Sequence, residues 1–208
     1  EVQIHTGKMM NQLSMLAKKL GVEVLTGTSV DSFHEDGNNC EVITEKGIVF
    51  KATKVAICTN AFTQKLIPNV DLKPGRGVVL ITKPIDGLAL KGTFHYDEGY
   101  YYFRNYQDRI IFGGGRNLDV EGENTADFEI RDLILNKLKQ DLGQLIIPGQ
   151  VYEIDHVWAG IMAFGENKRP ILKQQSDSIF LGVRLGGMGV AIGSKMGEEL
   201  ARMMFPES

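Results

Sequence analysis

The spacing of apolar residues near the start of the chain is helical. Leu13, Leu16 and Leu20 recur on one face, and Gly21 follows where a helix C-terminus favours glycine. This pattern predicts a helix over about residues 8–20.

Shorter apolar segments follow, and most are typical of β-strands. GVEVLTG (21–27) predicts a short strand and SVDSF (29–33) a second extended piece. A hairpin is predicted with strands at 40–44 and 48–51 and a turn at Lys46-Gly47. KVAIC (54–58) is a continuous apolar run, which is typical of a strand buried in a parallel sheet.

The pattern changes after Pro68. Three segments rich in aromatic and β-branched residues, separated by Gly, Asn and Asp, predict an antiparallel sheet; they are 74–84, 92–105 and 108–118. A helix is then predicted, with Thr125 as N-cap. Its apolar stripe is Ile130, Ile134, Leu138 and Leu142, ahead of Gly143.

The last part returns to the character of the first. A long strand is predicted over 150–164, followed by an apolar strand from Ile179, a glycine cluster and an amphipathic helix reaching Phe205. The simplest organisation is an α/β domain (mixed α+β) interrupted by an inserted antiparallel β-sheet domain. We place the boundaries at 1–72, 73–157 and 158–208.

Composition removes several function classes. A formal net charge of −3 over 208 residues gives no electrostatic case for nucleic acid or an anionic membrane surface. No apolar run is long enough to span a membrane. Two cysteines make no disulfide framework, so we expect a cytoplasmic protein. The four histidines show no metal-ligand spacing, and we expect no metal.

The closing glycines carry the clearest chemical signal. Gly186, Gly187 and Gly189 lie between a strand and a helix, where a backbone without side chains can approach a flat or anionic ligand. The N–H groups that open the helix, together with its dipole, stabilise negative charge. The spacing is not G-x-G-x-x-G, and tight packing at a turn is an equal alternative.

Four segments in order resemble the D-amino acid oxidase family, which includes glycine oxidase, sarcosine oxidase and related FAD-dependent oxidoreductases. They are QIHTGKMMNQLSMLAKKLGVEVLTGTSV, KATKVAICTNAFTQKLIP, HVWAGIMAFGENKRPIL and GVRLGGMGVAIGSKMGEELA. The resemblance implies an FAD-binding α/β domain with an inserted substrate domain. The family's N-terminal G-x-G-x-x-G motif does not occur, and we expect this chain to be the C-terminal portion of a longer protein.

The resemblance also implies cofactor contacts. In the family, a helix N-terminus at the closing glycines lies against the flavin ring, where it favours the negatively charged reduced form. The residues expected there are Leu185, Gly186, Gly187, Met188, Gly189 and Val190. Val30 is expected near the adenosine half through its backbone.

One family residue that binds substrate is absent. Relatives that oxidise amino acids use an arginine in a G-L-R-P segment to hold the substrate carboxylate through two hydrogen bonds. Here that segment is Gly160-Ile161-Met162-Ala163, so Met162 takes the place of the arginine. Arg184 and Arg104 are the replacement candidates; the alternative is surface arginines paired with carboxylates.

The aromatic run at 94–106 offers further candidates. An unbroken strand would place Tyr96, Tyr100 and Tyr102 on one side. In the family the matching sheet faces the flavin, so His95 and Tyr102 are candidates to contact the substrate amine. The alternative is aromatic packing against the helix expected at 125–142.

The resemblance favours an FAD-dependent oxidoreductase that oxidises an amine or amino acid by hydride transfer to flavin N5, this chain being inactive alone. A 2-hydroxy acid dehydrogenase and a non-catalytic binding module are the alternatives. We expect a small-molecule substrate and no nucleic acid partner, membrane span or metal. A homodimer is possible through surface that the missing half would cover.

Overall fold

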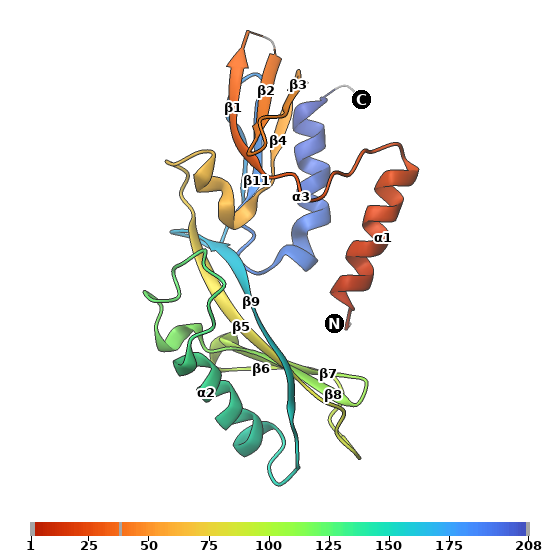
Figure 1. The fold of residues 1–208 in the computed structure, drawn as a ribbon, viewed down its shortest axis with the longest axis vertical. Helices are drawn as coiled ribbons and strands as arrows, with labels where there is room; N and C mark the ends of the chain where they lie inside the picture. Colours follow the sequence, from red (N-terminus) through yellow and green to blue (C-terminus); the bar gives the residue numbers. More distant parts are fainter. Residues whose placement is uncertain (1–2, 38, 207–208) are drawn as a thin grey trace. The chain divides into compact units, whose positions relative to one another are not determined.

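The computed structural model describes residues 3–37 and 39–206. The chain forms two compact units, one made of the residues up to Leu72 and from Phe164 onward, the other of Lys73–Ala163 (Figure 1). The second boundary lies six residues later than the 157/158 position expected from the sequence. The reason is that the last strand of the second unit continues to Phe164 as a member of its sheet.

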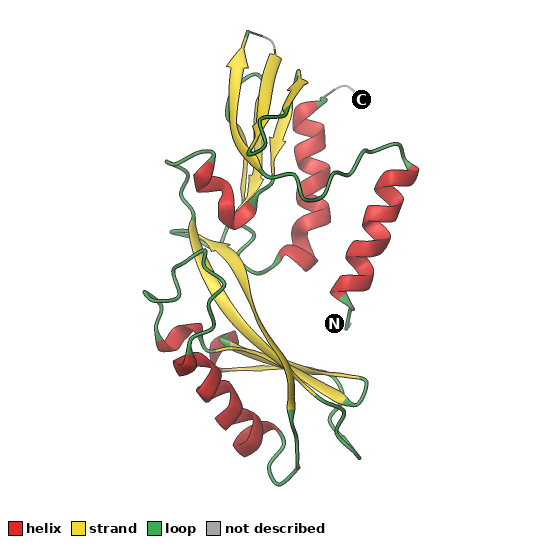
Figure 2. Cartoon of the chain, viewed as in Figure 1, coloured by secondary structure: helices red, strands yellow, loops and turns green. Residues whose placement is uncertain are grey.

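Unit 1 has mixed α/β structure (Figure 2). Its helices and strands are α1 (Thr6–Lys19), β1 (Val30–Asp36), β2 (Asn39–Thr44), β3 (Val49–Ala52), β4 (Val55–Ile57), the 3-10 helix η1 (Asn60–Lys65), β10 (Ile171–Gln174), β11 (Ile179–Val183) and α3 (Gly189–Met204).

The predicted hairpin is confirmed. β2 pairs with β3 in antiparallel register, and β1 adds to the other edge of β2 to complete a three-stranded sheet. Gly47 has φ +75°, a left-handed backbone conformation that a residue with a Cβ seldom adopts, and it makes the turn possible.

The parallel strand expected at KVAIC is confirmed, but within β4 burial is complete only at Ile57, Val55 being half-buried and Ala56 exposed. β4 pairs in parallel with β11, with Ile57 opposite Leu181, and both side chains are buried. β10 pairs antiparallel on the other edge of β11. α3 packs on this sheet through Leu200, which lies so close to Gly182 that a Cβ there would be 2.9 Å from it.

The strand predicted at residues 21–27 is wrong. This segment is irregular, and Val22, Val24 and Leu25 are exposed. No described strand runs alongside it to accept its backbone hydrogen bonds, and an extended segment without such a partner is not stable as a strand.

Unit 2 is a five-stranded antiparallel sheet with one helix. Its elements are β5 (Lys73–Thr82), β6 (Thr93–Tyr96), the 3-10 turns η2 (Asp97–Gly99) and η3 (Arg116–Leu118), β7 (Tyr101–Tyr106), β8 (Arg109–Gly114), α2 (Asp132–Asp141), the wide turn η4 (Leu142–Ile146) and β9 (Ile154–Phe164). The strand order is β6-β7-β8-β5-β9.

The core of unit 2 lies between one face of the sheet and α2. Leu80, Ile110 and Phe112 from the strands and Ile134 and Leu138 from the helix are at most 1% exposed. Burial of such a side chain stabilises a fold by roughly 1.5–3 kcal/mol.

The predicted N-cap of α2 is wrong by six residues, since the observed N-cap is Arg131. Thr125 caps no helix; its Oγ accepts the N–H of Asp127 at 3.1 Å in a local turn. The helix begins at Asp132. Arg131, the residue before it, forms an ion pair with Asp119. The apolar stripe at Ile134 and Leu138 is as predicted.

The unbroken aromatic strand is also wrong. Asp97, Glu98 and Gly99 all have positive φ and form a tight turn between β6 and β7. Tyr96 therefore stacks on Tyr101 at 4.7 Å between ring centroids, on the core face, instead of joining Tyr102. The D-E-G sequence is the turn signal that the strand prediction overlooked.

Candidate functional site

The glycine turn lies after β11, at the carboxyl end of the parallel β4–β11 pair. Gly186 and Gly187 have φ of +56° and +81°. The turn is closed by a 2.8 Å hydrogen bond from the N–H of Met188 to the carbonyl of Leu185. A Cβ on Gly186 would meet no atom within 4 Å, so the space over the turn is open.

The helix that follows presents its N-terminus to this open space. No side chain caps α3, and the N–H groups of Ala191 and Ile192 both reach the carbonyl of Met188. The first N–H groups of a helix have no partner within it and carry the positive end of its dipole. Met188 and Val190 are 57% and 50% exposed. The turn can therefore accept an electron-rich group.

The side chain of Arg184 is held inside unit 1 by hydrogen bonds to other residues. It is only 7% exposed and has φ +63°. Its guanidinium pairs with the Asp71 carboxylate and also donates to the carbonyl of Arg169 and to Asn167. With these donors used inside unit 1, the geometry argues against the substrate-binding role expected for Arg184. Both the αL backbone and the burial were invisible in the sequence.

Val30 is the first residue of β1 and is 39% exposed. The two residues before it, Thr28 and Ser29, line a hollow of about 110 Å³ together with residues of the β2–β3 turn. The backbone beside Val30 is thus accessible in unit 1, as contact through main-chain atoms requires.

In unit 2, His95 and Tyr102 are paired across β6 and β7. Arg104 is two residues further along β7, so its side chain leaves the sheet on the same face as that of Tyr102. His95 and Tyr102 are exposed, and Arg104 is partly exposed. The structure therefore brings these three candidates together.

Two glycines make room for large side chains on this face. A Cβ on Gly113 would lie 2.9 Å from the ring and hydroxyl of Tyr102. A Cβ on Gly77 would lie 3.0 Å from Cε of Met162 and 3.7 Å from the same hydroxyl. Tyr102 and Met162 therefore lie low on the sheet, with their ends close together.

The surroundings of Tyr102 also affect its ionisation. The residue is 41% exposed, yet protein atoms around the phenol raise its pKa above the ordinary value by desolvation. Tyr102 consequently stays protonated at neutral pH and can donate a hydrogen bond.

Trp158 is partly buried on β9, where its ring stacks on that of His156 with 5.8 Å between centroids. The two residues are two positions apart in one strand and so share a face.

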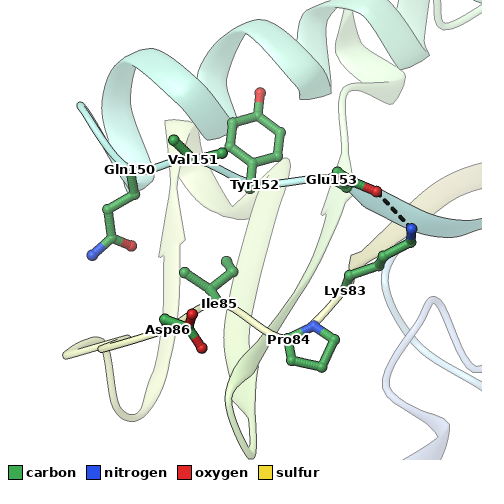
Figure 3. A pocket seen from close by; sticks show the side chains of 8 residues that line it. All are labelled: Lys83, Pro84, Ile85, Asp86, Gln150, Val151, Tyr152 and Glu153. Atoms are coloured by element: carbon green, nitrogen blue, oxygen red, sulfur yellow. Dashed lines mark hydrogen bonds and ion pairs between the residues drawn. The ribbon is translucent and has the colours of Figure 1, made fainter.

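A hollow lies elsewhere in unit 2. It has a volume of about 390 Å³, and an exposed ion pair of 2.6 Å between Lys83 and Glu153 lies at its edge (Figure 3). Its lining residues are Lys83, Pro84, Ile85, Asp86, Gln150, Val151, Tyr152 and Glu153. None of the residues predicted from the sequence lines it.

The described residues contain neither a candidate metal site nor a candidate membrane span. Within 3–37 and 39–206, no three His, Cys, Asp or Glu side chains are grouped so as to hold a metal ion. Over the same ranges, no helix combines the length and apolarity needed to cross a membrane.

Comparison with known proteins places the chain in a family. A family model described as FAD dependent oxidoreductase (DAO) matches residues 1–203. The chain belongs to this family. The match covers the glycine turn, the segment around Asn60 and the whole of unit 2, so it includes every candidate residue described above.

Solved structures share the fold. L-proline dehydrogenase from P. horikoshii is 20% identical with a TM-score of 0.76, and 93% of this chain aligns with 53% of that chain. Glycine oxidase from Geobacillus kaustophilus is 17% identical with a TM-score of 0.76, and 94% of this chain aligns with 53% of that chain. L-amino acid deaminase from Proteus vulgaris is 18% identical with a TM-score of 0.67, and 94% of this chain aligns with 50% of that chain. The chain spans about half the length of these proteins.

Proposed function

We propose that this chain forms part of an FAD-dependent oxidoreductase that oxidises an amine or an amino acid. The observation that carries the proposal is the open glycine turn at the N-terminus of α3, in a chain that matches the family over residues 1–203. The names of the similar structures, which include a glycine oxidase and an amino acid deaminase, support an amine or amino acid substrate.

The residues present fit a flavin. Gly186 and Gly187 keep the approach to the turn free of side chains, and the N–H groups that begin α3 would stabilise negative charge on the ring. Leu185, Met188, Gly189 and Val190 complete the proposed contact, with Val30 near the adenosine half. FAD bound there would supply a two-electron acceptor, with N5 as the proposed site for a hydride from the substrate carbon.

Unit 2 would contribute the residues that face the substrate. The phenol of Tyr102, kept protonated by its surroundings, can donate a hydrogen bond to a substrate oxygen or accept one from an amine. Met162 places an apolar end beside it, which excludes water. His95 and Arg104 are the remaining polar groups proposed on this face.

The absence of the family's arginine at position 162 bears on the substrate. Methionine cannot hold a carboxylate through two charged hydrogen bonds. On unit 2, Arg104 is then the residue proposed to bind the carboxylate of an acidic substrate. A secondary amine without a carboxylate would fit equally well beside the apolar Met162 side chain.

The test uses the protein as its gene encodes it, purified with FAD and kept free of oxygen. Amines, amino acids and 2-hydroxy acids are added in turn while the flavin absorbance is followed. Bleaching by an amine or amino acid is the expected result. Bleaching by hydroxy acids alone would favour the dehydrogenase, and no bleaching by any class would contradict the proposal.

We also propose that residues 1–208 alone retain little or no FAD, because no G-x-G-x-x-G turn is present to bind the pyrophosphate. Absorbance of the purified chain near the flavin maxima measures this. A yellow preparation with one FAD per chain would contradict it and would show that residues 1–208 are sufficient for binding.

A further inference from the structure

The carboxyl ends of β4 and β11 are held together by one side chain. The Oδ1 atom of Asn60 accepts the N–H of Arg184 at 3.1 Å and the N–H of Leu185 at 3.2 Å. Asn60 follows β4 and these two residues follow β11, so the bonds join segments more than 120 positions apart. Both bonds end at the entrance of the glycine turn.

Asn60 is itself fixed in an uncommon conformation. Its φ is +43°, in the left-handed region that asparagine tolerates better than most residues. The hydroxyl of Thr63, a residue with no exposed surface, donates to the carbonyl of Asn60 at 2.7 Å. The amide oxygen therefore has a defined position.

Arg184 is held from its other end as well. Its own φ is +63°, and its buried guanidinium binds the carboxylate and carbonyl of Asp71. Backbone and side chain are thus anchored separately, by Asn60 and by Asp71. Leu185, which begins the turn, has its N–H fixed by the first of these anchors.

We propose that Asn60 is a positioning residue that sets the glycine turn, and through it the N-terminus of α3, against the flavin. This inference rests on the proposed function. Asn60 touches neither cofactor nor substrate in this account; it acts through the backbone of Arg184 and Leu185. A neutral amide suits the place, because a carboxylate would accept the same two bonds and add a negative charge beside a ring that becomes electron-rich on reduction.

Two variants separate geometry from charge. Asn60→Ala removes the acceptor, so the N–H groups of Arg184 and Leu185 lose their partner. Asn60→Asp keeps an acceptor of the same shape and adds charge. Asn136→Ala is the matched control, since Asn136 is an exposed residue of α2 in unit 2.

The experiment uses the protein as its gene encodes it, loaded with FAD. Hydrogen exchange follows the amides of Arg184 and Leu185, and affinities are measured for oxidised and reduced FAD. For N60A we expect exchange and the FAD dissociation constant each to rise about tenfold or more, the effect of losing two hydrogen bonds. For N60D we expect near-normal exchange but a selective loss of affinity for the reduced form, about threefold or more, seen as a lower midpoint potential.

Two results would overturn the inference. One is unchanged FAD affinity in N60A, whether or not exchange becomes faster. The other, if N60A does not fold, is an unchanged midpoint potential in N60D. A wild-type protein that binds no FAD would instead defeat the proposed function itself. The N136A control is expected to match wild type in every measurement.

Discussion

At the scale of single residues, the most unusual group is a buried ion pair in unit 2. Arg76 donates two 2.8 Å hydrogen bonds to Glu123, and the two side chains are 3% and 1% exposed. Arg76 lies within β5, and its partner is 47 positions away, which no local pattern can reveal.

Breaking that pair should be costly. Arg76→Met leaves the Glu123 carboxylate buried without its main partner, and we expect a loss of about 3–5 kcal/mol in the free energy of unfolding. Urea unfolding measures it. The double variant Arg76→Met/Glu123→Leu should recover most of the loss, because replacing both charges leaves no buried carboxylate. A single variant within about 1 kcal/mol of wild type would contradict this account.

A second residue-scale prediction concerns pH. Cys40 is fully buried in β2, and burial together with the nearby carboxylates of Glu35 and Glu41 raises the pKa of its thiol above the ordinary 9.0. Above that value the unfolded chain releases this proton before the folded one does. The contribution of Cys40 to stability is therefore complete below pH 9.0 and is lost as the pH rises toward the folded pKa.

The measurement is urea unfolding between neutral pH and pH 10 on wild type and Cys40→Ala. The stability of wild type should fall more steeply with pH than that of the variant. Parallel curves would show that this thiol makes no such contribution.

At the scale of elements, β8 depends on a glycine at its end. Gly114 has φ +132°, and a Cβ there would lie 2.1 Å from the carbonyl oxygen of Tyr100 on the neighbouring chain segment. The close approach lets η2 and β7 fold against β8. β8 ends at this glycine.

Gly114→Ala should therefore lower the free energy of unfolding by about 2–4 kcal/mol, because backbone atoms must move and the conformation is strained. Gly160→Ala is the control. Gly160 has an ordinary φ, and its Cβ would meet nothing within 4 Å, so we expect a change within about 0.5 kcal/mol. Equal effects of the two substitutions would refute the steric explanation.

The elements also show where local patterns were sufficient. α1, the β2–β3 hairpin, the parallel β4 strand and the stripe of α2 were predictable because each has a periodicity or turn residue of its own. The segment at 21–27 has a strand-like composition, but no strand among the described residues pairs with it. The start of α2 is set by contacts of Arg131, and only the packed chain supplies those.

At the scale of the whole molecule, the surface of α1 is the notable feature. The helix has no buried residue, and Met10, Leu13, Leu16 and Leu20 are 49–74% exposed in the described structure. The chain also spans only about half the length of similar solved structures. Apolar surface of this kind promotes association.

We expect residues 1–208, produced alone, to self-associate through α1. Leu13→Glu should shift the light-scattering mass toward that of one chain. Gln12→Glu adds the same charge at a neighbouring exposed position and should have less effect. A chain that is already monomeric, or an equal response to both changes, would contradict the expectation.

The sequence by itself determined the family, the alternation of α/β and antiparallel β segments, and the place of the glycine turn. These features depend on residues that are close together along the chain. Tertiary structure decided the rest: that Arg184 is buried against Asp71, that Tyr96 faces the core while Tyr102 does not, and that Asn60 holds the entrance of the turn. Each depends on groups brought together from distant positions, where hydrogen bonding and burial, rather than local pattern, select the partner.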